Sequence, residues 1–360
     1  GRLPAVDRLG GAGVHPGLIS ERKEELLLKL DFHTHGKLAK RLPFSTIYTD
    51  WLFGEAKDAG LSALCLTEHF NTLQFDELYA YLAGKSRREG DTLVLENGLR
   101  VFPGMETDIA EGGHILSIGP LEAILELNQR LAPYKQPGAF LPFAKLRDLF
   151  DQYPVLVGGA HPYREGGHIP QLPEEQLARL DFLDLNGKDL ATDRQRAEHL
   201  TKGLGERLGK PVVSGSDTHQ AVQYGCVWTE FAKDFSTVRE LKEEMEAGRY
   251  AVTVAENAAE KVKTATLLKR ALKEIHALGG DYVAVLTGPE KDREHGPSYG
   301  ERIAVRHKAV VVDYAPQAGN MAKELEAAAD EMSQKGWELA SSSVTPGAKG
   351  ILLFRKKSAE

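Results

Sequence analysis

Two pairs of residues in this chain have the types and spacing of metal ligands. His33 and His35 come directly after a short apolar run over residues 30–32, and Asp217 and His219 follow a later run. Residues i and i+2 at the end of a β-strand point to the same side, so both members of a pair can reach one ion. Imidazole and carboxylate groups together suit zinc, manganese or iron. The two pairs therefore predict a metal site.

Further potential ligands lie at the ends of other apolar runs: His69, Glu106, His114 and His161. A single histidine, or a lone His-x-His or Asp-x-His pair, is more often a surface or core residue than a ligand. The placement of nearly all these groups next to separate runs is hard to obtain by chance. The joint pattern favours a metal centre built from several segments of the chain.

The elements that must position these groups follow from the hydrophobic pattern. Short apolar runs, which predict strands, cover residues 30–32, 63–66, 101–105, 115–118, 155–160, 182–185 and 212–214. Helical patterns lie between several of them, for example over residues 48–59 and 174–180. Strands that alternate with helices predict a parallel sheet, closed into a barrel at this length. The carboxyl ends of barrel strands meet at one end, which is where the candidate ligands would lie.

The last part of the chain has a different pattern. An amphipathic helix is predicted over residues 258–276, and Gly279 and Gly280 then mark a break. Beyond it, strands are predicted over residues 282–286, 309–312, 337–340 and 351–354, with a helix over 321–334 that ends before Gly336. The predicted organisation is a lead-in over residues 1–28, a barrel over 29–256, a linker helix over 257–280 and a small α+β domain over 281–360.

Composition narrows the classes of function. The 360 residues carry a formal charge of −7 and no long Lys/Arg block, which disfavours long nucleic acid as a partner. The two cysteines, Cys65 and Cys226, lie in apolar stretches and are expected to be buried thiols. No apolar run is long enough to span a bilayer, so we expect a cytoplasmic protein without a membrane partner.

The motifs occur in a recognisable order. They are Asp31-Phe32-His33-Thr34-His35, Thr67-Glu68-His69, Gly104-Met105-Glu106, Gly113-His114, Ala160-His161-Pro162 and Ser216-Asp217-Thr218-His219. In this order the chain resembles the polymerase and histidinol phosphatase (PHP) superfamily over residues 29–256. The resemblance implies a distorted TIM-like (βα)7 barrel, two or three divalent metal ions (zinc, manganese or iron) and no organic cofactor.

The resemblance also implies a role for each ligand. The implied groups are His33, His35, Glu106 and Asp217 for one metal; Glu106, as a bridge, with His114 and His161 for a second; and His69 and His219 for a third. Many members have a further histidine or aspartate in the loop after the His-x-His motif, and residues 36–41 of this chain contain neither. The third metal would therefore be weakly bound or absent.

Two further residues are candidates for catalysis. Arg164 follows His161 on the same predicted face, and a guanidinium suits a bidentate grip on phosphate; a structural ion pair is the alternative. Glu68 stands where the family more often has aspartate. It is expected to orient a metal ligand, with a plain exposed carboxylate as the alternative.

Substrate contacts are predicted from the loops near the motifs. Lys37, Lys40 and Arg41 lie in the loop after His35 and are candidates for binding the substrate phosphate, with a solvated basic loop as the alternative. His168 lies in a glycine-rich loop and could reach the mouth of the site; a plain loop residue is the other interpretation.

Three functions are consistent with these features. The first is hydrolysis of a small phosphomonoester, histidinol-phosphatase-like or otherwise, by a metal-activated water. The second is a nuclease or nucleotide phosphoesterase. The third is a metal-stabilised, non-catalytic scaffold whose C-terminal domain binds a partner. The near-complete ligand set argues against a scaffold, and the C-terminal domain is open to homo-oligomerisation or a lid role.

Overall fold

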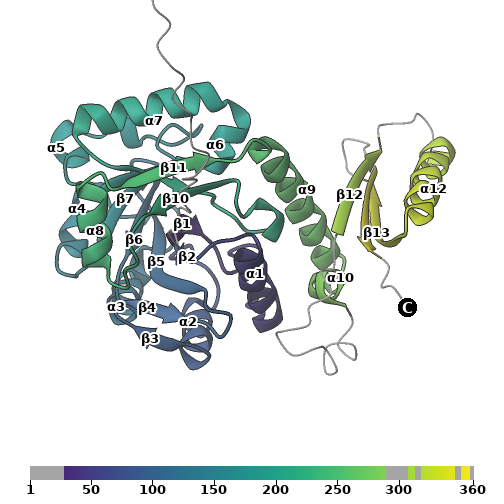
Figure 1. Cartoon of the computed structure of the whole chain (residues 1–360), viewed down its shortest axis with the longest axis horizontal. Coiled ribbons are helices and arrows are strands. Elements are labelled where there is room, and N and C mark those ends of the chain that lie inside the picture. The colour runs from purple at the N-terminus through teal and green to yellow at the C-terminus, as the bar shows by residue number, and fades with distance from the viewer. Residues whose placement is uncertain (1–27, 289–306, 313–317, 345–349, 357–360) are drawn as a thin grey trace, which may run out of the picture.

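The computed structural model describes residues 28–288, 307–312, 318–344 and 350–356. Its main sheet forms a nearly closed barrel (Figure 1), in which neighbouring strands follow the order β11-β10-β1-β2-β5-β6-β7-β8-β9. The strands are β1 (Leu28–Thr34), β2 (Ala63–Leu66), β5 (Arg100–Asp108), β6 (His114–Ile118), β7 (Leu156–Ala160), β8 (Phe182–Asn186), β9 (Val212–Gly215), β10 (Val227–Phe231) and β11 (Tyr250–Val254). A short hairpin, β3 (Arg87–Glu89) and β4 (Thr92–Val94), extends the sheet beside β5.

The barrel closes between β9 and the second half of β1. Thr34 forms a parallel bridge with Thr218, and the Asp217 amide donates to the carbonyl of His33 at 2.7 Å. The first half of β1 pairs instead with β10, which runs antiparallel to it. The predicted barrel class is confirmed, although the described barrel path has nine strands and not the seven that were expected. The closure brings the segments of His33 and Asp217 into direct backbone contact.

Besides β10 and β11, which pair antiparallel, β6 also departs from the predicted parallel arrangement. β6 runs antiparallel to both β5 and β7. The connection from β5 to β6 is a short turn in which Gly112 and Gly113 have positive φ angles of 90° and 112°. Antiparallel strands can be joined by such a turn, whereas a parallel pair needs a crossover of a dozen or more residues. As a result the first residue of β6 lies at the same end of the barrel as the last residues of its neighbours.

Helices surround the barrel strands. They are α1 (Thr46–Asp58), α2 (Phe75–Gly84), α3 (Leu121–Arg130), α4 (Phe143–Phe150), α5 (Glu174–Leu177), α6 (Gly187–Thr192), α7 (Arg194–Leu208) and α8 (Val238–Glu246). The helix predicted over residues 48–59 is confirmed as α1, whereas the one over 174–180 is shorter. Side-chain caps fix several starts; Thr237 and Glu240, for example, form a capping box at α8. Among the described residues, no helix is long and apolar enough to cross a membrane.

Two apolar layers hold the barrel. Phe32, Phe102, Phe182 and other buried side chains belong to one cluster built from alternate strand positions, and the remaining strand side chains pack against the surrounding helices. Gly158 of β7 lies against the ring of Phe182 so closely that a Cβ there would overlap it. Cys65 and Cys226 are buried free thiols, as predicted.

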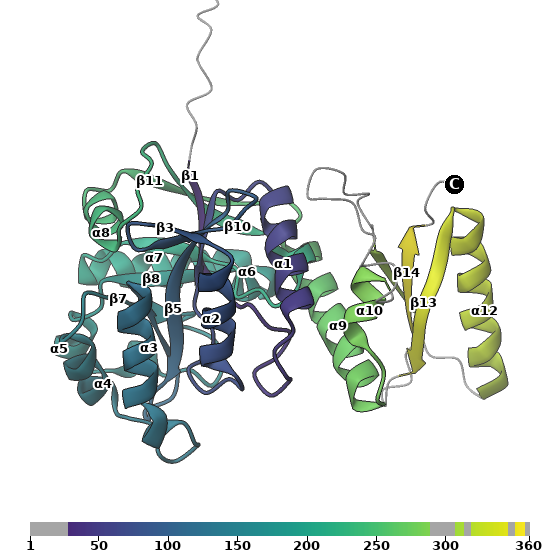
Figure 2. The same ribbon diagram turned by 90° about the horizontal axis from the view of Figure 1, so that it is seen from below.

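The C-terminal elements lie beside the barrel (Figure 2). They are α9 (Ala258–Ala277), α10 (Tyr282–Thr287), β12 (His307–Val312), α12 (Ala318–Gln334), β13 (Trp337–Val344) and β14 (Gly350–Lys356). The three strands form an antiparallel sheet in the order β12-β14-β13. Leu352 and Phe354 of β14 pack with Met332 of α12, while Ile351 and Leu353 belong to the large cluster that also contains residues of α9. Both faces of this sheet are therefore covered.

The strand predicted over residues 282–286 is wrong, because this segment is helix α10. Asp281 caps it by accepting from the amides of Val283 and Ala284. The ring of Tyr282 packs against Tyr48 of α1, with centroids 5.7 Å apart. The cap and this tertiary contact outweigh the β propensity of a segment with two valines. The boundaries predicted for the lead-in, the barrel, the linker helix and the C-terminal domain remain predictions.

A glycine substitution tests the close packing inside the barrel. Gly158→Ala is expected to lower the free energy of unfolding by about 1–3 kcal/mol, because the added methyl group overpacks the contact with Phe182. The matched control is Gly203→Ala on the exposed side of α7, where nothing lies within 4 Å and alanine should stabilise the helix. Urea denaturation measures both. Equal stability of Gly158→Ala and the wild type would contradict this packing.

Candidate metal centre

A β-bulge in β1 aims His33 into the barrel. The register between β1 and β2 shifts between Asp31 and Thr34, so β1 contains one extra residue there. In a regular strand, neighbouring side chains point to opposite faces. Here Phe32 packs in the interior cluster, and yet the next residue, His33, also faces inward, with Nδ1 2.9 Å from Asp184 Oδ2. The bulge thus allows the packed apolar side chain of Phe32 to be followed by an inward-pointing histidine.

Glu106, near the end of β5, lies at the centre of the site. Its Oε1 is 2.7 Å from His114 Nδ1, 3.2 Å from His161 Nε2 and 3.5 Å from His33 Nε2. Its Oε2 is 2.9 Å from His69 Nδ1 and 3.5 Å from His35 Nε2. Both oxygens of this one carboxylate are thus shared among imidazoles from four different strands or loops.

Three overlapping groups in the described residues could hold metal ions. In each, one ligand atom per residue lies within 4.8 Å of the others: His33, His35 and Asp217; His33, Glu106 and His161; and His35, His69 and His219. The third group has three histidines although the loop over residues 36–41 supplies none. All the predicted ligands meet here, with His114 joined to the second group through Glu106 and His161.

Three buried or half-buried carboxylates surround the histidines. Asp184 Oδ2 lies 2.9 Å from His33 Nδ1. Asp108 Oδ1 lies 3.1 Å from His114 Nε2, and Glu68 Oε1 lies 3.6 Å from His35 Nδ1. Glu68 is fully buried and also accepts from the amides of Gly36 and His69, so the exposed-carboxylate alternative is wrong. Asp184 and Asp108 were not predicted from the sequence. A charged residue inside the apolar run over residues 182–185 was the available signal for Asp184.

Two residues of the site have backbone angles that side chains rarely adopt. Asp217 has φ 56° and His161 has φ 32°, each just after a barrel strand. A non-glycine residue in this region costs about 1–3 kcal/mol, which the surrounding contacts must offset. The two strained residues are thus both candidate ligands whose side chains point into the site.

Unpaired buried atoms fit the proposal that cations bind here. His33 Nε2 and both ring nitrogens of His35 are buried and make no hydrogen bond with the described residues. Buried polar atoms normally have partners, since each unsatisfied one costs free energy. The donor set of neutral imidazoles and carboxylates suits zinc, manganese or iron. The buried clusters therefore indicate several metal sites without naming the metal.

Three of the candidate ligands have the protonation state that metal ligation requires, whereas neighbouring carboxylates outweigh burial and raise the pKa of His33, His35 and His114. Burial, together with the charge of Arg164, lowers the pKa of His161 to about 4, and burial also holds the pKa of His219 well below its ordinary value. Burial opposes the ionisation of Glu106, but His114, His69 and His33 outweigh it and keep its pKa well below the usual range. His161 and His219 are thus neutral at pH 7 and Glu106 is charged, as metal ligation requires.

Arg164 lies at the mouth of the site. It donates to Asp217 Oδ2 at 2.8 Å, Asp189 Oδ1 at 3.0 Å and Asn186 Oδ1 at 2.5 Å. Lys188, a residue that the sequence analysis did not single out, also contacts Asp217 Oδ2 at 2.8 Å. Two cations therefore converge on a carboxylate of the first group.

The other residues predicted to contact the substrate phosphate differ from Arg164 in their burial and in their hydrogen-bond partners. The ammonium of buried Lys37 donates to Thr72 Oγ1 at 3.1 Å and to the carbonyl of Leu73, and these partners speak against its contact with substrate. Lys40 is half-buried and Arg41 exposed. His168 is exposed and is held to the carbonyl of Glu111 at 2.7 Å, outside the three groups.

Comparison with known proteins supports the resemblance. Residues 199–250 match the family described as PHP-associated. No curated protein matches the chain. Its fold is similar to that of PsfC from Pseudomonas syringae, with a TM-score of 0.58 and 22% identity over 68% of this chain and 99% of that one. The family match supports the predicted resemblance to the PHP superfamily, and the similarity to PsfC supports the barrel fold.

More distant similarities were also found. The lesion-specific endonuclease PfuEndoQ from Pyrococcus furiosus has a TM-score of 0.46 and 17% identity, over 63% of this chain and 58% of that one. A proposed metal-dependent phosphoesterase from Bifidobacterium adolescentis has a TM-score of 0.34 and 16% identity, over 53% and 88%.

Metal analysis tests the histidine clusters. His35→Ala, which removes a residue common to two of the three groups, is expected to lower the metal content of the purified chain and to reduce the loss of melting temperature caused by a chelator. Elemental analysis and thermal melts measure the two effects. His199→Ala, on the exposed side of α7, is the matched control. Equal metal content in all three proteins would rule out binding at these clusters.

Proposed function

Starting from a PHP-type barrel with a PHP-associated segment, we propose that this chain is a metal-dependent phosphoesterase. The proposed reaction is hydrolysis of a small phosphate ester. One observation supports it above all: three overlapping groups of histidines and carboxylates lie together at one end of the barrel, and several of their buried nitrogen atoms have no hydrogen-bond partner among the described residues. Shared ligands are typical of sites where adjacent metals act on one phosphoryl group.

The carboxylates around the cluster would prepare its ligands. Bound metals would supply Lewis-acid stabilisation of charge on the phosphoryl group. Asp184 accepts a hydrogen bond from His33 Nδ1 and so leaves Nε2 facing the centre of the site. Glu68 takes the equivalent place behind His35 and is proposed as a positioning residue. Glu106 would be shared between metals, because both of its oxygens face imidazoles.

Arg164 and Lys188 would bind the substrate phosphate. Arg164 is anchored by Asp189 and Asn186 on one side, which holds the guanidinium plane next to Asp217. A preorganised cation at this position would neutralise charge that develops during transfer. Among the predicted loop cations, Lys40 and Arg41 remain candidates for the edge of the substrate, whereas His168 lies outside the clusters and Lys37 is bonded elsewhere.

A phosphate-release panel tests the proposed function. In the presence of manganese, we expect release from at least one small ester among histidinol phosphate, sugar phosphates and mononucleotides, and none from His33→Ala. His199→Ala should retain full activity. Release only from a single-stranded oligonucleotide would favour the nuclease alternative. Absence of release from a metal-loaded chain would contradict the proposal and favour the scaffold alternative.

Substitution of Arg164 tests its role in phosphate binding. Arg164→Met is expected to lower kcat/KM by about 100-fold, the typical loss when one preorganised donor is removed. Arg164→Lys should recover only part of this loss. The ammonium keeps the positive charge, but it cannot form the two parallel hydrogen bonds of a guanidinium. The control is Arg179→Met, whose guanidinium makes only surface ion pairs with Asp148 and Asp151. Wild-type kinetics in Arg164→Met would remove it from the site.

A further inference from the structure

A cavity of about 280 Å³ lies between the barrel and helix α9. Three segments line it: the start of α6, the loop after β9, and the barrel-facing side of α9. His219 belongs to this lining and also to the third histidine group, so the cavity adjoins the candidate metal centre. Helix α9 follows the last strand of the barrel sheet and thus adds a wall to the site from outside the barrel.

The cavity is strongly basic. Four of its lining residues are cations, Lys188, Lys269, Arg270 and Lys273, and no carboxylate lines it. Among the described residues, Lys269, Arg270 and Lys273 have no ion-pair partner; Lys188 alone is paired, with Asp217. Like charges gathered without counter-charges repel one another unless an anion lies among them. Such a gathering is notable in a chain of net charge −7.

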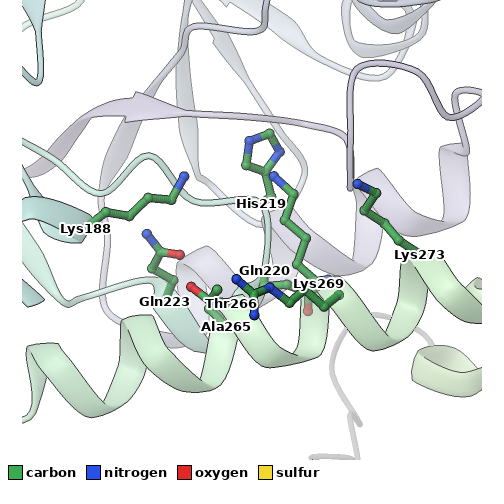
Figure 3. Close-up of a pocket in the computed structure, with 9 residues that line it drawn as sticks. Lys188, His219, Gln220, Gln223, Ala265, Thr266, Lys269 and Lys273 are labelled. Carbon is green, nitrogen blue, oxygen red and sulfur yellow. The ribbon is translucent and has the colours of Figure 1, made fainter. Parts of the chain in front are cut away.

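Two of the cationic groups, those of Lys188 and Lys269, are aimed toward the metal centre. Figure 3 shows Lys188 and Lys269 reaching toward His219 from two different elements, with Lys273 one helical turn beyond Lys269. Residues i and i+4 of a helix lie on the same face, about 6 Å apart along the axis. The row of charges therefore extends from the metal centre by more than the size of a single tetrahedral phosphate.

We propose that this cavity is an anion subsite for a second phosphate or carboxylate group of the substrate. The inference rests on the proposed phosphoesterase function and narrows it to small esters that carry at least two anionic groups. The cleaved ester would occupy the histidine clusters beside Arg164, and the second group would lie beside Lys269 and Lys273. Lys188, which contacts Asp217 and also lines the cavity, would lie between the two anionic groups.

Non-hydrolysable probes test the subsite by binding alone. The full-length, manganese-loaded chain is titrated by calorimetry with methylphosphonate, 3-phosphonopropionate and propane-1,3-bisphosphonate. These probes carry one phosphonate, a phosphonate with a carboxylate, and two phosphonates. The wild type is expected to bind at least one two-anion probe about tenfold more tightly than methylphosphonate, as one charge-assisted hydrogen bond would allow. The better of the two identifies the second group as carboxylate or phosphate.

Variants of α9 assign the effect to the cavity. Lys269→Met and Lys273→Met should each remove most of the advantage of the two-anion probe and leave methylphosphonate binding unchanged, while Lys269→Arg should keep it. Lys263→Met, on the exposed side of the same helix and outside the cavity, is the matched control and should behave as the wild type.

Two results would overturn the subsite. One is equal affinity of the wild type for all three probes; the other is an equal loss for all probes in Lys269→Met, which would place Lys269 at the reacting group. The binding test is independent of turnover. A Lys269-dependent preference in a chain that releases no phosphate would support the subsite and contradict the phosphoesterase, and release without such a preference would do the reverse.

Discussion

The buried carboxylate of Glu106 is the constraint on which the rest of the site depends. A buried charge is stable only when other groups pair with it, and five imidazoles lie within 3.5 Å of its oxygens. Their convergence requires the bulge in β1, the reversed direction of β6 and the positive φ of His161. Each is a departure from a regular parallel barrel, and each aims one or more side chains at the same point.

Around this centre, charge is arranged in layers. Asp184, Asp108 and Glu68 lie behind the histidines, where they orient rings and balance the positive charge that metals would bring. Arg164 and Lys188 lie in front, on Asp217. The cations of α9 extend this outer layer away from the barrel. Such an arrangement of charges fits an anionic substrate. The row of cations along α9 favours a substrate that is larger than one phosphate and carries a second anionic group.

Much of the centre was predictable, because the types and positions of its ligands are local properties of the sequence. The predicted ligands all meet at one end of the barrel. The prediction failed where a residue acts through a distant partner: Asp184 lies 151 residues from His33, and a single carboxylate within an apolar run has no local partner that would reveal its role. Lys188 and Lys269 were not predicted either, because their neighbours in the site come from distant parts of the chain. The segment over residues 282–286 was mistaken for a strand because its cap and its contact with Tyr48 were not weighed against β propensity.

The sequence by itself determined the alternation of strands and helices and the presence of histidines and carboxylates at strand ends, since both depend on spacing along the chain. Only the tertiary structure decided which ligands share an ion, which lysines face the site, and that β6 is reversed. These features depend on the order of strands around the barrel and on where α9 packs. The physical reason is that a metal centre is assembled from long-range contacts, whereas sequence periodicity reports only which face of its own element each residue occupies.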